Sequence, residues 1–159
     1  MNITTRPAEI DDLEELERLY RELELEQNNL KAIWSSADGL SEPVEASLKT
    51  LLEDPDSIVL FGELDGVSLG FIWARVEDLL PQAEGRQLGV IRLIYVEHEA
   101  RGVGVGHEMI EAALAEMRSR GVTLFDAKVL PGHRYAKNFF EAHGFSARLI
   151  FMHHEDSDE

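Results

Sequence analysis

A glycine-rich stretch in the middle of the chain constrains its fold more than any other feature. An apolar run, Val90–Val96, is followed by a short polar link and then by the sequence RGVGVG at Arg101–Gly106. Apolar residues then recur at helical spacing as far as Gly121. Glycine accepts positive φ and close approach, and the first N–H groups of a helix have no partners within it. The stretch therefore predicts a strand, a tight turn and a helix whose N-terminus can bind an anion such as a phosphate.

The spacing of the glycines excludes two common phosphate-binding motifs. A P-loop requires Gly-Lys-Ser/Thr after the turn, and none follows here. The dinucleotide fingerprint G-x-G-x-x-G, counted from Gly102, would need glycine where His107 stands. A tight turn that binds no ligand stays open as an alternative at this point.

Composition excludes several classes of partner and chemistry. The 159 residues contain no cysteine, which rules out disulfides, a thiolate nucleophile and a cysteine-based metal site. With 31 acidic and 15 basic side chains, the net charge of −16 repels nucleic acid and anionic membranes and attracts cationic substrates, although it also serves solubility. No apolar run is long enough to span a membrane and the N-terminus does not resemble a signal peptide, so we expect a cytoplasmic protein.

The remaining patterns predict an α/β protein with a central mixed sheet and helices on both faces. Asp65-Gly66 lies between two apolar runs and is typical of a hairpin turn. We expect one domain over residues 1–153 and an acidic tail over 154–159. Strands are predicted over residues 2–6, 57–64, 67–76, 87–96, 123–130 and 145–153. Helices are predicted over residues 9–26, 43–53, from the glycine turn to 121, and 134–143.

Two motifs resemble those of a known family. Arg-x-x-Gly-x-Gly after a strand that ends at Val96 resembles the acetyl-CoA-binding motif of the GCN5-related N-acetyltransferases, the GNAT family. The sequence AKNFFEAHGF at Ala136–Phe145 resembles that family's last helix and the Gly-Phe after it. The motifs come in the family's order, and the resemblance covers nearly the whole chain. It implies the GNAT fold, in which the strands before and after the glycine-turn helix splay apart around the pantetheine arm.

The resemblance also implies an activity. In this family an acetyl group passes from acetyl-CoA, a cosubstrate, to an amine by direct attack, with neither a covalent enzyme intermediate nor a metal. The acceptor is expected to be a small-molecule or peptide amine, and a homodimer is an assembly that members often form. The residues implied in cofactor binding are Ile94, Tyr95, Val96, Arg101, Gly102, Val103, Gly104, Val105, Gly106, His107, His133 and Phe140.

The chain departs from the family pattern at two positions near the last helix. Phe140 stands where many members have a tyrosine that protonates the leaving thiolate, and phenylalanine has no proton to give. His133 stands where many members have an asparagine that touches the cofactor. Tyr135 is therefore a candidate acid, with Tyr95, His133 and water as alternatives. Phe140 also favours a second hypothesis, a non-catalytic acetyl-CoA sensor, and an acyltransferase for a longer acyl group is a third.

The sequence constrains the general base and the acceptor site less than it constrains the cofactor site. Glu63, Glu77 and Glu97 are candidate bases, and a water relay is an equal alternative. Arg92 lies among apolar residues, and either pairs with an acid of the hairpin or points into the acceptor site, where it would favour an acceptor with a carboxylate. In the family, the segment between the first two helices, here residues 27–42, usually lines the acceptor pocket.

Overall fold

The computed structural model describes residues 2–30, 39–130 and 132–157. Most of the segment expected to line the acceptor pocket, residues 31–38, lies outside these ranges. The strands are β1 Ile3–Pro7, β2 Ser57–Leu64, β3 Val67–Asp78, β4 Gln87–Val96 and β5 Leu124–Ala127. The α-helices are α1 Leu13–Asn28, α2 Val44–Glu53, α3 Val105–Ser119 and α4 Arg134–Ala142. Short 3-10 helices occupy Ile10–Asp12, Pro81–Ala83 and His98–Ala100.

The strands form one mixed sheet in the order β1-β2-β3-β4-β5. Neighbouring strands are antiparallel except β4 and β5, which are parallel because α3 crosses over between them. Asp65 and Gly66 turn the β2–β3 hairpin with φ values of 49° and 83°. The mixed sheet and its hairpin confirm the prediction from the sequence.

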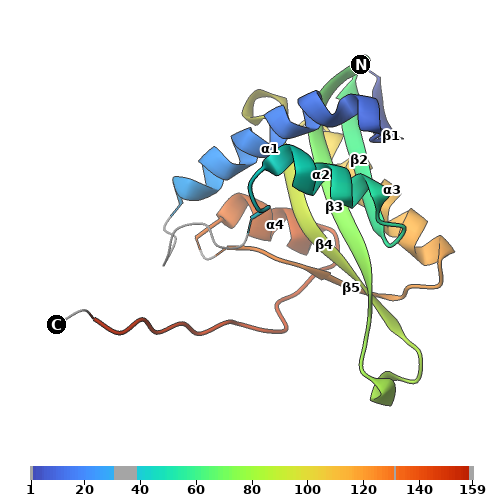
Figure 1. Ribbon diagram of the computed structural model, residues 1–159, viewed down its shortest axis with the longest axis vertical. Helices are drawn as coiled ribbons and strands as arrows, with labels where there is room; N and C mark the ends of the chain where they lie inside the picture. Colours follow the sequence, from blue (N-terminus) through green and yellow to red (C-terminus); the bar gives the residue numbers. More distant parts are fainter. Residues whose placement is uncertain (1, 31–38, 131, 158–159) are drawn as a thin grey trace.

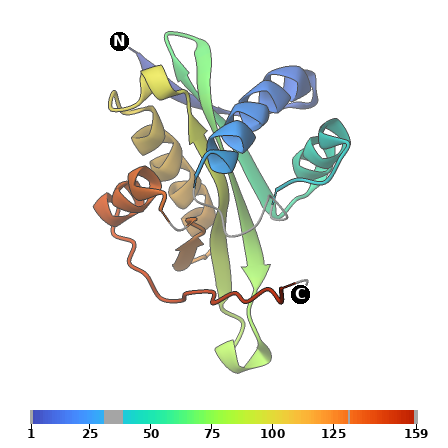
Figure 2. The ribbon, with the colours of Figure 1, turned by 90° about the vertical axis from the view of Figure 1, so that its left-hand side faces the viewer.

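Helices cover both faces of the sheet, as predicted (Figures 1 and 2). Side chains of a strand alternate between faces, so neighbouring apolar residues enter different cores. Phe71 packs in the core under α1 and α2, whereas Ile72 packs in the core under α3. The α3 core also receives Phe140 of α4. None of the helices in the described residues is both long enough and apolar enough to cross a membrane.

Glycines on the sheet let α3 lie close to it. A Cβ atom at Gly62 would come within 2.6 Å of Val105 Cγ1, and one at Gly89 within 2.5 Å of Met117 Sδ. Any larger residue would push the helix outward, because packed interiors leave no room for the extra atom. The N-terminus of α3 is therefore held firmly against the sheet.

The C-terminal part of the sheet differs from the sequence prediction. The strand predicted over residues 123–130 is shortened to β5, and the strand predicted over 145–153 is wrong, since these residues form no strand. Phe145 still packs on Phe140, with ring centroids 5.3 Å apart, but the chain then leaves the sheet. The apolar pattern indicates only that the segment favours an extended conformation. A strand also needs a neighbouring strand to pair with, and the pattern gives no information about that neighbour.

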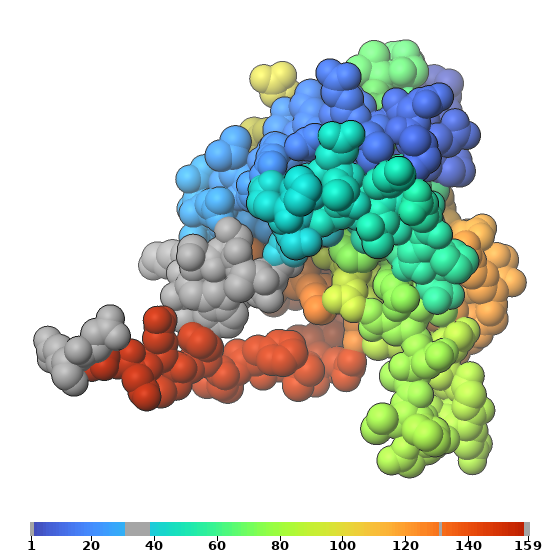
Figure 3. Space-filling view, viewed as in Figure 1, coloured from blue at the N-terminus to red at the C-terminus, as the bar shows by residue number. Residues whose placement is uncertain are grey.

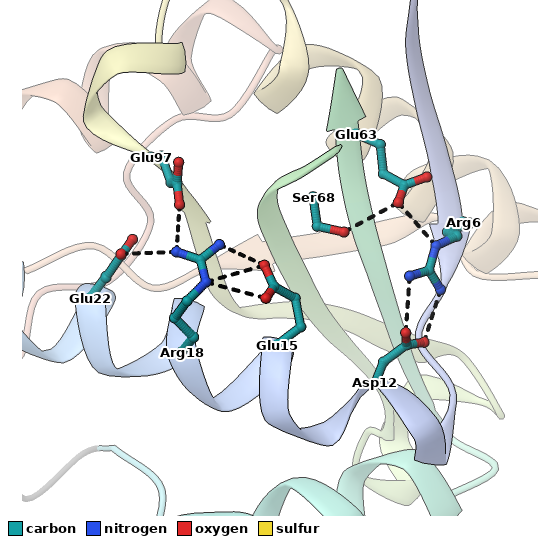
Figure 4. Close-up of polar contacts among 8 residues, drawn as sticks. All are labelled: Arg6, Asp12, Glu15, Arg18, Glu22, Glu63, Ser68 and Glu97. Carbon is teal, nitrogen blue, oxygen red and sulfur yellow. Dashed lines mark hydrogen bonds and ion pairs between the residues drawn. The ribbon is translucent and has the colours of Figure 1, made fainter. Parts of the chain in front are cut away.

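Arg6 and Asp12 connect β1 to the start of α1 (Figure 4). The Arg6 guanidinium donates to both carboxylate oxygens of Asp12, at 2.8 and 3.0 Å, and to Glu63 at 3.1 Å. Asp12 Oδ2 also accepts the backbone N–H of Glu9 at 2.8 Å. The hydrogen bonds from Arg6, helped by that from Glu9, outweigh partial burial and lower the pKa of Asp12 below its usual value.

We expect Asp12→Asn to lower the free energy of unfolding at pH 7 by about 1–2 kcal/mol, because the charge-assisted pair with Arg6 is lost. The Asp12 carboxyl has a lower pKa in the folded state than in the unfolded chain, where its pKa is about 3.9. This stabilisation is therefore present above about pH 4 and is lost as the pH falls through the folded-state pKa. Urea unfolding at several pH values checks this, and the exposed neighbour Asp11 provides the control Asp11→Asn. Equal losses in the two variants would contradict the expectation.

Candidate functional site

The sheet opens between β4 and β5. Parallel pairing runs from Leu88 with Leu124 to Ile91 with Ala127, and Lys128 N–H makes a last contact with Ile91 O at 3.4 Å. Beyond Ile91, β4 continues with β3 as its neighbouring strand. The β3–β4 register shifts at this point, leaving Arg92 as an extra, bulged residue. The splayed strands expected from the resemblance are present.

The register shows which backbone groups of β4 face the opening. Glu97 N–H donates to Leu69 O at 2.8 Å, and antiparallel residues alternate between facing a partner strand and facing away. The backbone of Tyr95 therefore faces β3, and the N–H and C=O groups of Ile94 and Val96 face the opening. Val96 O accepts a hydrogen bond there from Arg101 Nε at 3.0 Å.

The glycine turn takes the predicted conformation at the N-terminus of α3. Gly104 is the N-cap with φ 105° and ψ 3°, and Gly102 also has positive φ, at 83°. The N–H groups of the first helical turn have no acceptors within the helix, so they leave a positive pole at this end. Gly106 lines the same cavity as Val96. The anion-binding helix end and the open strand edge are thus adjacent.

A small cavity of about 30 Å³ lies where β4, α1 and the N-terminal ends of α3 and α4 meet. Its lining residues are Leu23, Glu26, Ile94, Tyr95, Val96, Arg101, Gly106, His133, Tyr135, Ala136 and Phe139. Six of the residues implied in cofactor binding are therefore gathered here. Arg101, His133 and Tyr135 are among the lining side chains, so their positions determine the room left for a pantetheine arm.

Arg101, His133 and Glu26 contact one another on the wall of this cavity. Arg101 is only 13% exposed, forms an ion pair with Glu26, and lies 4.7 Å from the ring centroid of Tyr135. His133 Nε2 lies 3.2 Å from the other oxygen of Glu26 but without hydrogen-bond geometry, which leaves it a buried nitrogen without a hydrogen-bond partner. Arg101 thus turns into the cavity, and reaching a phosphate requires it to leave Glu26. The orphaned nitrogen suits a ligand that brings a polar group into the cavity.

Tyr95 is a buried phenol on the cavity wall. Burial, followed by the negative charge and hydrogen bond of Glu22 and the charge of Glu26, raises the pKa of Tyr95 to about 12. Arg101 opposes this shift only in part. Tyr95 therefore stays protonated at neutral pH, as a donor that holds its proton tightly. Tyr135, in the first turn of α4, is 47% exposed and can meet a ligand at the mouth.

Two of the candidate bases, Glu63 and Glu97, lie in ion-pair networks (Figure 4). Neither lines the cavity. Glu63 accepts from Arg6 at 3.1 Å and from Ser68 Oγ at 3.2 Å. Glu97 accepts from Arg18 at 2.6 Å, which links α1 to the end of β4. Both carboxylates hold elements of the fold together, and the carboxylate in the cavity is instead that of Glu26.

Arg92 pairs with an acid of the hairpin. Its guanidinium forms an ion pair with Glu77 on β3 and lies 6.0 Å from the ring centroid of Trp73. Of the two interpretations left open by the sequence, the structure therefore confirms pairing with the hairpin. Glu77, the third candidate base, is occupied by the same contact.

The last helix presents a different phenylalanine to the cavity from the one expected. Phe140 is 4% exposed and packs in the α3 core, and Phe139 lines the cavity. Phe140, which was expected at the cofactor, is not among the residues that line this cavity. Leu23, Glu26, Ala136 and Phe139 are cavity residues that the sequence did not indicate, because spacing within one helix does not show which face a distant strand will meet.

His107 lies in the first turn of α3, where its side chain is exposed and contacts His143 at the end of α4. Its Nδ1 lies 2.9 Å from His143 Nε2, while His143 Nδ1 donates to Phe139 O at 2.8 Å. The ligand atoms of His107, Glu111 and His143 all lie within 4.8 Å of one another, so this is a group of described residues that could hold a metal ion. No metal was expected from the sequence, in which His143 lies 36 positions from His107.

The sequence pattern of the Acetyltransferase (GNAT) family matches residues 10–145, which include the glycine turn, α3 and α4. The chain belongs to this family. Mycothiol acetyltransferase of Propionibacterium freudenreichii is 29% identical over 93 residues, which are 58% of this chain and 28% of that protein. The uncharacterized N-acetyltransferase YhfO of Bacillus subtilis is 23% identical over 127 residues, 80% of this chain and 83% of that protein. The match thus spans less than a third of the mycothiol enzyme.

Solved structures confirm the GNAT fold. Ribosomal-protein-alanine N-acetyltransferase from Brucella melitensis superposes with a TM-score of 0.73 at 17% identity, covering 98% of this chain and all of that one. AAC(6')-Iy, solved in complex with a bisubstrate analog of CoA, superposes with a TM-score of 0.74 at 20% identity and the same coverage. At this level of identity the likeness concerns the fold.

Proposed function

We propose that this GNAT protein transfers an acetyl group from acetyl-CoA to an amine. The observation that carries the proposal is the opening of the sheet beyond Ile91, directly beside the glycine turn at the start of α3. An open strand edge offers hydrogen bonds to an amide-bearing arm, and a helix N-terminus offers N–H groups to a pyrophosphate. Acetyl-CoA carries both groups in one molecule.

Each part of the cosubstrate has a residue to hold it. The pyrophosphate is bound by the N–H groups of Gly102–Gly106, and Arg101, the residue before the turn, can add its charge once it is released from Glu26 and from Val96 O. The pantetheine amides pair with the gap-facing backbone of Val96. The N–H of Ile94 is placed farther along the same edge, where it can stabilise negative charge on the thioester oxygen.

The reaction needs one amine, one thioester and three proton transfers. The neutral amine attacks the carbonyl carbon, the nitrogen of the tetrahedral intermediate loses a second proton, and CoA leaves as a thiolate, which gives the amide. The second proton, carried by water, restores whichever group has protonated the thiolate. An aliphatic amine must first lose a proton, and Glu26 is the cavity carboxylate that can take it directly or through water. The thiolate takes a proton from Tyr135, which replaces the missing tyrosine of the family pattern. No enzyme group becomes covalently attached.

A cationic small-molecule or peptide amine fits the electrostatics of the site best. The net charge of −16 attracts cations, and the face of α1 beside β4 carries Glu22 and Glu26. Structural neighbours include an aminoglycoside acetyltransferase in complex with sisomicin and the ribosomal-protein-alanine enzyme. With Arg92 paired to Glu77, the guanidinium that favoured an acceptor with a carboxylate is already occupied.

Titration calorimetry with acetyl-CoA, followed by release of CoA thiol across a panel of amines, tests the proposal. Binding with turnover on cationic amines is the expected result. Binding without turnover on any amine would favour the sensor hypothesis, and tighter binding of butyryl-CoA would favour a longer acyl group. Failure to bind any acyl-CoA would contradict the proposal.

A further inference from the structure

Three side chains that can bind a metal join the start of α3 to the end of α4. His107 and Glu111 lie four positions apart on α3, so they share one face of that helix. His143 follows the last residue of α4, and its Nε2 atom lies 2.9 Å from His107 Nδ1. The ligand atoms of the three residues all lie within 4.8 Å of one another. Two imidazole nitrogens and a carboxylate oxygen therefore face the same small volume.

The ring of His143 has the orientation that a metal ligand needs. Its Nδ1 atom lies 2.8 Å from Phe139 O, and because a carbonyl oxygen can only accept, Nδ1 carries the proton. The neutral ring then has its free lone pair on Nε2, the nitrogen that faces His107. Metal-binding histidines almost always donate their other N–H group to a carbonyl, a carboxylate or water, which fixes the tautomer and the orientation of the ring. The backbone of α4 thus leaves Nε2 ready to bind a metal.

The two imidazole nitrogens are close to the separation that a shared metal ion requires. Zn²⁺ binds histidine nitrogen at about 2.0–2.1 Å, so two such nitrogens in a tetrahedral site lie roughly 3.3 Å apart. At 2.9 Å, His107 Nδ1 donates a hydrogen bond to His143 Nε2. An ion would replace this hydrogen bond: the rings would separate by a few tenths of an ångström, and the His107 proton would move from Nδ1 to Nε2. Because the His107 side chain is exposed, water can hydrate that second nitrogen.

Glu111 supplies a negative charge that no arginine or lysine neutralises. Its side chain is exposed, and among the residues that the structure describes it forms no ion pair. Glu26 and Glu63, by contrast, are both paired with arginines. An exposed carboxylate can change its rotamer easily, so Glu111 can turn toward the two imidazoles. The net charge of −16 further favours the approach of a divalent cation.

We propose that His107, Glu111 and His143 bind a zinc ion, with water completing its coordination. Imidazole and carboxylate ligands suit Zn²⁺, whereas Mg²⁺ and Ca²⁺ prefer sites made of oxygen atoms alone. None of the three residues lines the cavity that would receive the cosubstrate, so the ion has no step in acetyl transfer. The zinc site is therefore separate from the proposed function, and its test does not depend on acetyl-CoA.

A zinc ion at this place fastens α4 to α3. The two helices already meet beside it: the rings of Phe139 and His143 lie 4.6 Å apart between centroids, and a Cβ atom at Gly106 would come within 3.1 Å of the Phe139 ring. Gly106 and Phe139 both line the cavity. The ion therefore ties together two helices that form part of the cavity wall. Because it binds the folded arrangement of ligands, it also stabilises the native state.

Titration calorimetry of the full chain, free of any affinity tag and of metal, with zinc chloride tests the site. We expect one zinc ion to bind per chain, and an excess of Mg²⁺ not to compete. Glu111→Gln and His143→Gln should each weaken zinc binding by at least about tenfold, the least that losing even an outer-shell partner of a ligand typically costs. Failure of the natural chain to bind zinc, or unchanged zinc affinity in both variants, would overturn the proposal.

The C-terminal segment provides the matched control, because it also places a histidine beside an acid. His154 Nε2 lies 2.9 Å from Asp156 Oδ1. Figure 3 shows residues 146–157, in red, as a narrow extension below the body of the molecule and away from α3. His154→Gln should bind zinc like the natural chain, and zinc should raise the melting temperature of both but not that of His143→Gln. Loss of zinc binding in His154→Gln, with normal binding in His143→Gln, would assign the ion to the C-terminal segment and refute the site.

Discussion

Gly104→Val is expected to weaken acetyl-CoA binding by at least about 100-fold, roughly 2.7 kcal/mol, while leaving the fold intact. Gly104 holds φ at 105°, where a β-branched side chain is strongly disfavoured. Its Cβ atom would also lie 3.3 Å from Ile3 Cδ1. The turn must change its path, and the N–H groups that converge on the pyrophosphate then point elsewhere. Titration calorimetry with acetyl-CoA measures the loss.

Strain at a left-handed glycine can also destabilise the whole protein, so a matched control is needed. Gly85 has φ of 83° in the β3–β4 connection, and a Cβ atom there would meet nothing within 4 Å. Gly85→Val should bring a similar backbone strain of about 1–2 kcal/mol without touching the site. We expect it to bind acetyl-CoA normally, with a lowered melting temperature like that of Gly104→Val. Normal affinity for acetyl-CoA in Gly104→Val would mean that the turn connects β4 to α3 without binding the cosubstrate.

The central part of the fold was predictable because its information is local. Alternating apolar residues around Asp65-Gly66 identify the hairpin from neighbouring positions alone. The glycine turn is equally local, since positive φ at Gly104 follows from the requirements of a strand-to-helix connection. Even the unpaired end of β4 was expected, although only through the resemblance to the family.

The cavity was less predictable because its contacts join distant parts of the chain. Arg101 and Glu26 are 75 positions apart, and nothing near either residue indicates the other. Phe139 and Phe140 show the same limit on a smaller scale. Both are apolar and adjacent, and the packing of α4 against α3 decides that Phe140 enters the core and Phe139 the cavity.

The C-terminal segment shows where a correct propensity led to a wrong element. Residues 145–153 have the composition of a strand, but they form no strand in the structure. Strand formation depends on an available edge, which is a property of the whole fold or of an assembly.

Tyr135→Phe is expected to reduce kcat by about 100-fold while changing the affinity for acetyl-CoA by less than about threefold. The variant keeps the ring that lies 4.7 Å from the Arg101 guanidinium and loses only the phenol proton. If that proton neutralises the departing thiolate, its loss affects the chemical step and not binding. Steady-state rates with the best amine, together with calorimetry, separate the two effects.

Tyr95→Phe is the matched comparison, because it removes the other phenol of the cavity wall. Burial and the acids of α1 raise the pKa of Tyr95 to about 12, which makes it a weak proton donor to a thiolate. We therefore expect Tyr95→Phe to retain most of the activity. A large loss of kcat in Tyr95→Phe with normal rates in Tyr135→Phe would move proton donation from α4 to β4. Normal rates in both variants would assign it to His133 or to water, since Phe139 and Phe140 have no proton to give.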